Sequence, residues 1–157
     1  MTSDNKVANR TISQRSELIH DVQEYSINWD TREIYLGPYH HRDDSEEVDD
    51  RMALQLIKNL TFLSHLNKSK EPVLLHMVTC GGDWNYGMAI YDAVQQCQCP
   101  ISILAYAHAR SMSSIIFQAA DYRVLMPNTD FLIHFGFFSV SGNWTSAEAE
   151  SEWNKKC

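Results

Sequence analysis

The 157-residue sequence has no long hydrophobic run and no excess of basic residues, and it contains few cysteines. No apolar stretch approaches the ~20 residues that span a bilayer, and the polar opening MTSDNKVANRTISQRSE is unlike the hydrophobic region of a secretory signal. Thirteen Lys and Arg against twenty Asp and Glu give a net charge of −7, without the basic stripe of nucleic-acid-binding proteins. We therefore expect neither a secreted nor a membrane protein, and no nucleic-acid partner.

The four cysteines, Cys80, Cys97, Cys99 and Cys157, do not resemble a disulfide framework. Cys97 and Cys99 are not matched by a second Cys or His pair that would complete a zinc site. The histidines also lack the spacing of metal ligands. We therefore predict reduced thiols in a cytoplasmic protein that holds no metal and no cofactor.

What is present is the composition of one globular domain, with 44% hydrophobic and 21% charged residues. Residues 1–32 have weak periodicity and are predicted to be a mobile arm with short ordered pieces. Residues 33–145 are predicted to form an α/β domain. Residues 146–157 begin a further helix, because Thr145 and Glu148 have the spacing of a capping box.

The central region alternates between apolar runs of strand length and stretches with helical periodicity. The acidic cluster at residues 43–50 precedes the first of these helices and reads as its solvated N-terminal turn. Strands are predicted at residues 33–36, 73–78, 101–107, 122–126 and 131–135, helices at 48–63, 85–96 and from Ser111, and tight turns at 79–83 and 108–110.

This order predicts repeated βαβ units around a parallel sheet that is buried on both faces. Ligands of such folds bind at the carboxyl ends of the strands. The turns around Gly82 and Ser111 both fall at that edge, so we expect the functional site there.

Ser111 is predicted to stand where a strand turns into a helix, with its hydroxyl at the helix N-terminus. The amides of Met112 and of the Gly81–Gly82 turn could converge on an oxyanion, and His134 is the best-placed candidate base. Each element alone has an ordinary interpretation: a serine that caps a helix, glycines in a turn, and a core histidine. The prediction depends on their combination.

Three segments resemble the proteolytic subunit of the Clp protease family. Residues 79–92, TCGGDWNYGMAIYD, are similar to its Ser-Pro-Gly-Gly…Gly-x-x-Ile-Tyr-Asp motif. Residues 107–112, AHARSM, resemble its Gly-x-Ala-Ala-Ser-Met motif around the active serine. Residues 126–134, MPNTDFLIH, resemble its Leu-Pro-Asn-Ser…Ile-His motif, and the resemblance extends from about residue 34 to 142.

The resemblance implies an α/β fold of the Clp protease and crotonase type and a serine endopeptidase acting on unfolded polypeptides. It implies Ser111 as nucleophile, His134 as general base, and the amides of Gly82 and Met112 as the oxyanion hole. It also implies stacked homo-oligomeric rings of seven subunits, fed by an ATP-driven AAA+ unfoldase, and a helix after residue 145 that begins the handle between the rings.

The sequence departs from the family pattern in three ways. Cys80 replaces a proline and Ala107 a glycine, both compatible with the same turns. Arg110 replaces a small alanine just before the serine, where it could alter substrate preference, crowd the pocket or point outward. The family's triad aspartate follows its histidine, whereas no aspartate follows His134 in this sequence.

The glutamates at 148, 150 and 152 read as a solvated helix face, so the third triad residue is not assigned. A chain without it could be a truncated, split or diverged ring subunit, and a non-catalytic ring component is therefore an alternative to the peptidase. A further alternative is an acyl-CoA enzyme of the crotonase fold, which needs two amides but no serine–histidine pair.

Overall fold

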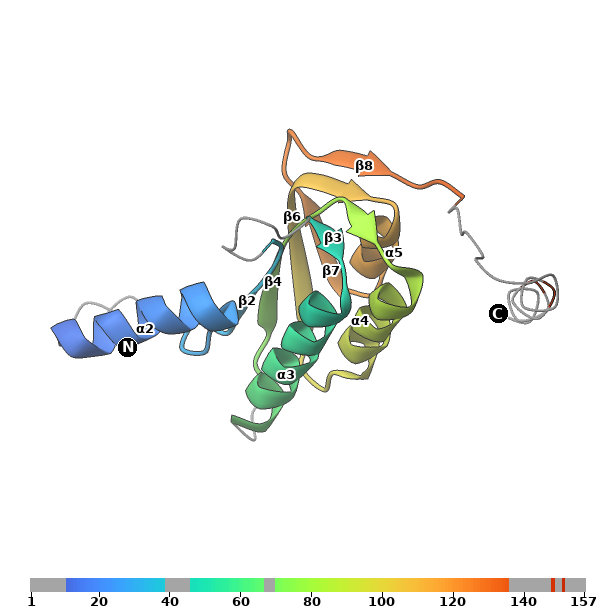
Figure 1. Ribbon diagram of the computed structural model, residues 1–157. Coiled ribbons are helices and arrows are strands. Elements are labelled where there is room, and N and C mark those ends of the chain that lie inside the picture. Colours follow the sequence, from blue (N-terminus) through green and yellow to red (C-terminus); the bar gives the residue numbers. More distant parts are fainter. Residues whose placement is uncertain (1–10, 39–45, 67–69, 136–147, 149–150, 152–157) are drawn as a thin grey trace.

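The computed structural model describes residues 11–38, 46–66, 70–135, 148 and 151. Helices and strands follow one another along these residues in the order shown in Figure 1. They are α2 (Ile12–Tyr25), β1 (Ile27–Asn28), β2 (Glu33–Leu36), β3 (Glu47–Val48), α3 (Asp50–Leu66), β4 (Val73–Thr79), β5 (Gly81–Gly82), α4 (Trp84–Gln96), β6 (Ile101–Arg110), α5 (Met112–Gln118), β7 (Tyr122–Leu125) and β8 (Asp130–Leu132).

The main sheet has the strand order β1-β2-β4-β6-β7, and β8 also pairs with β6. Its pairs are parallel except for β1 with β2. Strand β6 is long enough to pair with β7 along Ser102–Ala105 and with β8 along His108–Arg110. A small second sheet pairs β3 with β5, also in parallel. The mostly parallel sheet confirms the predicted α/β fold class.

The core lies between the sheet and the helices α3, α4 and α5. Alternate residues of β4 and β6 point to these helices, and Leu75, Met77 and Ile103 are completely buried there. On the other face, side chains such as His76 and Tyr106 are only partly buried. Helices α3, α4 and α5 therefore cover one face of the sheet (Figure 1), and the described residues do not bury the other face as the continuous apolar runs predicted.

Residues 12–25 form a longer helix than the short ordered pieces expected of the N-terminal arm. Thr11 and Gln14 form a capping box at the start of α2. No residue of α2 is buried, which explains why the sequence shows no apolar stripe there. The mobility of the arm stays a prediction. Of the predicted C-terminal helix, residues 148 and 151 are helical, and its other residues lie outside the described part of the chain.

Several boundaries near the site differ from the predicted ones. Helix α3 begins at Asp50, because Val48 belongs to β3 and the Asp49 carboxylate accepts a hydrogen bond of 2.8 Å from the Met52 amide. The predicted turn at 108–110 is the last part of β6. Strand β8 is shorter than the predicted strand 131–135, so His134 lies just beyond it.

Candidate active site at a strand–helix turn

Ser111 occupies a sharp turn between β6 and α5. Its backbone has φ 52° and ψ −126°, outside the regions that a non-glycine residue favours. Such a conformation costs on the order of 1–3 kcal/mol and persists where its surroundings hold it. Here the Ser111 amide donates to the Leu132 carbonyl at 2.8 Å, and the Ser114 amide and hydroxyl donate to the Ser111 carbonyl at 3.0 and 2.6 Å.

The Ser111 hydroxyl does not serve the ordinary role of a helix cap. It forms no capping hydrogen bond to α5, although Ser111 stands at the N-cap position. A strained strand-to-helix turn whose serine hydroxyl does not cap the helix is the geometry that presents a nucleophile in hydrolases of other folds. The arrangement is therefore suited to nucleophilic chemistry.

The glycine turn after β4 packs directly against Ser111. Gly81 has φ +104°, and a Cβ added to it would lie 2.7 Å from the Ser111 Cβ and 3.0 Å from the Met112 amide nitrogen. Gly82 has φ +151°, and its added Cβ would meet the backbone nitrogen of Val48. The structure thus brings Gly81, Ser111 and the Met112 amide nitrogen close together, whereas Gly82 faces the backbone of Val48.

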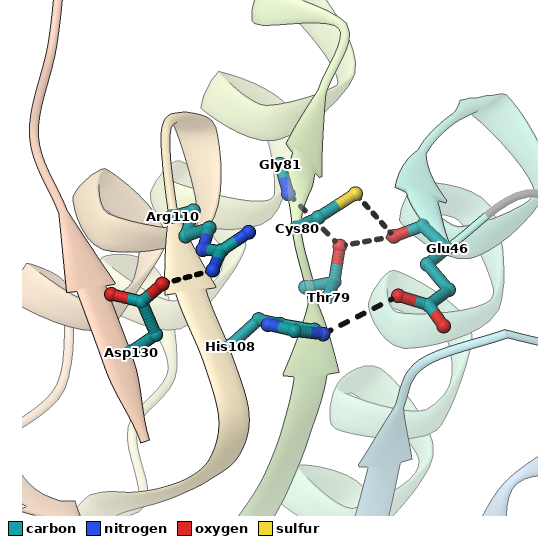
Figure 2. Close-up of polar contacts among 7 residues, drawn as sticks. All are labelled: Glu46, Thr79, Cys80, Gly81, His108, Arg110 and Asp130. Atoms are coloured by element: carbon teal, nitrogen blue, oxygen red, sulfur yellow. Dashed lines mark hydrogen bonds and ion pairs between the residues drawn. The ribbon is translucent and has the colours of Figure 1, made fainter. Parts of the chain in front are cut away.

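Thr79 holds this glycine turn in place. Its side chain is completely buried, and its hydroxyl donates to the Glu46 carbonyl at 2.6 Å and accepts from the Gly81 amide at 3.3 Å. Figure 2 shows the hydroxyl between these two segments. From the sequence, Thr79 is expected only to begin a turn. The family motif has a serine at this position, and that hydroxyl is the sequence signal that could have identified Thr79.

The segment before His134 reaches the serine through strand pairing. Leu132 lies opposite Arg110 and accepts the hydrogen bond from the Ser111 amide, and His134 follows two residues later. His134 is exposed, and no hydrogen bond between its ring and the Ser111 hydroxyl is present among the described residues. Catalytic hydrogen bonds are often long in the absence of substrate, so this geometry leaves His134 as the candidate base.

Arg110 has a charged partner that the sequence pattern does not predict. Its guanidinium forms an ion pair and a hydrogen bond with the carboxylate of Asp130 on β8 (Figure 2). The two side chains are 40% and 53% exposed. A sequence pattern could not pair them, because their contact depends on the register of β6 and β8. The structure therefore shows the Arg110 guanidinium paired with the Asp130 carboxylate.

Cys80, next to the glycine turn, is a poor candidate for an alternative nucleophile. Burial, with the nearby carboxylates of Glu46 and Glu47, raises the pKa of its thiol, so the neutral form dominates near neutral pH. The thiol contacts the Glu46 carbonyl at 3.7 Å. Across the described part of the chain, no group of three or more His, Cys, Asp or Glu side chains could hold a metal ion. No described helix is long and apolar enough to cross a membrane.

Comparison with known proteins agrees with this architecture. The sequence model of the Clp protease family matches residues 30–155. The chain is also 29% identical, over 140 residues, to the ATP-dependent Clp protease proteolytic subunit of Deinococcus radiodurans. That alignment covers 88% of this chain and 63% of the relative, so the chain spans less than two thirds of the relative's length. Because the family match covers most of the sequence, the chain belongs to the Clp protease family.

Proposed function

We propose that the chain is a serine endopeptidase of the Clp type that hydrolyses peptide bonds of unfolded polypeptides. Ser111 is the nucleophile, His134 the general base, and the amides of Gly82 and Met112 form the oxyanion hole. The observation that carries the proposal is the strained Ser111 turn packed against Gly81, where an added Cβ would lie 2.7 Å from the Ser111 Cβ. A glycine is needed here for close approach, and a serine that only capped a helix would not need this strain.

In the proposed reaction the Ser111 hydroxyl attacks the carbonyl carbon of the scissile peptide bond and transfers its proton to His134. The amides of Gly82 and Met112 donate to the oxyanion of the tetrahedral intermediate, and one such donor contributes a factor of ~10²–10³ in rate. His134 then protonates the leaving amine. Water, deprotonated by His134, hydrolyses the acyl-enzyme and restores Ser111.

The group that would orient His134 is not assigned. Within the described residues, His134 forms no ion pair with a carboxylate. Without an orienting carboxylate a serine peptidase loses about 10⁴-fold in turnover, while the nucleophile and oxyanion hole remain reactive. This favours a second candidate function, a non-catalytic ring subunit that keeps the fold for assembly. An acyl-CoA enzyme would leave the strained serine without a role.

The proposal includes a homo-oligomeric ring, with seven subunits and a double ring by resemblance, and an ATP-driven AAA+ unfoldase as partner. All residues of the β7 strand are exposed, with Tyr122 at 67% and Val124 at 51%. Parallel sheets are normally covered on both faces, so a neighbouring subunit is the natural cover for the open face. The proposal includes no cofactor. It includes a cytoplasmic location, because the cysteines at 80, 97 and 99 are free.

A fluorophosphonate probe tests the nucleophile because it phosphonylates an activated serine without requiring full turnover. We expect one label per chain at Ser111, no label in Ser111→Ala, and slower labelling in His134→Ala. Ser102→Ala, which removes a serine from the other end of β6, is the control and should label normally. A folded wild-type protein that remains unlabelled would overturn the proposal. Co-purification with an active Clp subunit, with complex activity unchanged in Ser111→Ala, would establish the non-catalytic alternative instead.

A further inference from the structure

We propose that the Arg110–Asp130 ion pair fixes the register of β8 on β6 and thereby positions His134 relative to Ser111. The part that concerns His134 rests on the proposed function. Arg110 and Asp130 are thus positioning residues, and neither is expected to touch the substrate carbonyl. Besides this ion pair and its pairing with β6, β8 is held by the hydrogen bond from the Ser111 amide to the Leu132 carbonyl and by the edge contact of the Phe131 ring with Phe117, at a centroid distance of 6.2 Å.

The side chains of β8 are not buried deeply enough to fix the position of the strand. It consists of three residues, all exposed, including Phe131 at 37% and Leu132 at 46%. The preceding loop is anchored, because the Met126 amide and the Thr129 hydroxyl donate to the Ala105 carbonyl at 3.0 and 2.8 Å. Short strands with few buried contacts open at low free energy and have weakly specified registers.

The ion pair runs diagonally between β6 and β8. Asp130 lies opposite His108 and Leu132 lies opposite Arg110, so the side chain of Arg110 reaches back from one end of β8 to the other. Diagonal pairs of long side chains across neighbouring strands are within reach on the same face of a sheet. Figure 2 shows the guanidinium and the carboxylate turned toward one another, while the Glu46 carboxylate lies 3.7 Å from His108.

A slip of one residue would break this arrangement. Because side chains alternate between faces, the slip would turn the Asp130 carboxylate to the opposite face, away from Arg110. It would also displace the Leu132 carbonyl, which accepts the 2.8 Å hydrogen bond from the Ser111 amide. His134, two residues beyond Leu132, would move with it. The charged pair therefore favours the observed register, in which Leu132 is bonded to Ser111 and His134 follows two residues later.

The expected size of the effect on β8 docking follows from the exposure of the Arg110 and Asp130 side chains. Both side chains are partly exposed, so solvent and salt screen their attraction. Exposed ion pairs of this kind change an equilibrium by about two- to fivefold. We expect an effect of that size on the population of docked β8, and on the labelling rate of Ser111.

The experiment combines hydrogen exchange with fluorophosphonate labelling of the full chain. Asp130→Asn and Arg110→Met remove the pair, and Asp130→Glu keeps the charge. The double variant Arg110→Asp with Asp130→Arg reverses it. Asp92→Asn is the matched control, because it removes one exposed carboxylate from α4. Exchange of the peptide containing residues 129–133 reports docking of β8 whether or not Ser111 reacts.

We expect about two- to fivefold faster exchange and slower labelling in Asp130→Asn and Arg110→Met, with an unchanged dissociation constant of the probe. Asp130→Glu and the reversed pair should recover both rates, Asp92→Asn should match the wild type, and added salt should slow labelling only where the pair is present. Unchanged exchange in both single variants would overturn the inference even if Ser111 is labelled. Faster exchange with unchanged labelling would overturn the link to His134. A wild-type chain that exchanges as described but never labels would remove the proposed function and with it that link, leaving the register effect established.

Discussion

Gly81 lies so close to Ser111 that the two residues define each other's conformation. An added Cβ on Gly81 would lie 2.7 Å from the Ser111 Cβ and 2.8 Å from the Arg110 carbonyl oxygen. Cβ atoms do not approach other heavy atoms so closely in real structures. The two strand ends can meet only if residue 81 has no side chain and Ser111 accepts a positive φ.

Gly81→Ala is therefore expected to displace the glycine turn from Ser111. The alanine would meet mainly backbone atoms and would also have to adopt φ +104°, which costs on the order of 1–3 kcal/mol. We expect Ser111 labelling by a fluorophosphonate to fall at least tenfold, a factor that corresponds to about 1.4 kcal/mol. Ala89→Gly, a change of the same size on α4, is the comparison. Labelling at the wild-type rate in folded Gly81→Ala would contradict this role of the contact.

Thr79→Val is expected to loosen the glycine turn without changing its shape. Valine fills the same buried space but loses the hydrogen bonds to the Glu46 carbonyl and the Gly81 amide. Leaving buried polar groups unsatisfied costs about 1–3 kcal/mol. Urea denaturation should show this loss in Thr79→Val and a smaller one in Thr79→Ser, which keeps the hydroxyl. Equal stability of the valine and serine variants would show that the methyl group, not the hydroxyl, matters.

Arg32 is buried, and no carboxylate among the described residues forms an ion pair with it. Only 6% of its surface is exposed, and its guanidinium donates to the carbonyls of Leu63, Glu71 and Pro72 at 3.1–3.2 Å. It also contacts the Cys99 sulfur at 3.3 Å. This arginine therefore closes the end of α3 and joins it to the start of β4.

Arg32→Met should lower the free energy of unfolding by at least about 2 kcal/mol, because hydrogen bonds to a charged group contribute roughly 1.5–3 kcal/mol and the buried carbonyls would lose their donor. Lys58→Met, on the exposed side of α3, is the control and should change stability by less than about 0.5 kcal/mol. Both are measured by chemical denaturation. A small effect of Arg32→Met would mean that water replaces the guanidinium at these carbonyls.

Tyr35 is expected to make stability fall at alkaline pH. Partial burial and the 3.0 Å hydrogen bond to the Glu33 carboxylate raise the pKa of its hydroxyl from 10.0 to about 12. A raised pKa means that the folded state binds the proton more tightly, so this stabilisation is complete below pH 10 and disappears as pH rises from 10 to 12. Tyr35→Phe should flatten the stability curve in that interval, as measured by denaturation at several pH values. An identical alkaline slope in the variant would contradict the raised pKa.

Local sequence was sufficient to predict the elements that build the core. The apolar run before Thr79 became β4, and the three- and four-residue spacing of Met52, Leu56, Leu60 and Leu63 became the buried stripe of α3. Both signals arise because a strand or helix must repeat its apolar residues with its own period to bury one face. The glycine turn and Ser111 could be assigned to one sheet edge for a similar reason, since parallel strands end on the same side.

Other features of the site have no local signal. The two-residue strands β3 and β5 are too short to show a period, and the positive φ of Ala107 inside β6 follows from no residue preference. The pairing of Arg110 with Asp130 depends on how two separate strands align. Such alignments are decided by the sum of contacts across the fold.

The sequence by itself determined the α/β architecture and the identity of the residues at the carboxyl edge, because periodicity and motif order are properties of the chain. Only the tertiary structure decided which of them touch. The approach of Gly81 to Ser111, the burial of Arg32 and the register of β8 on β6 come from the packing of distant segments. Packing fixes positions to within an ångström, and no one-dimensional pattern contains that information.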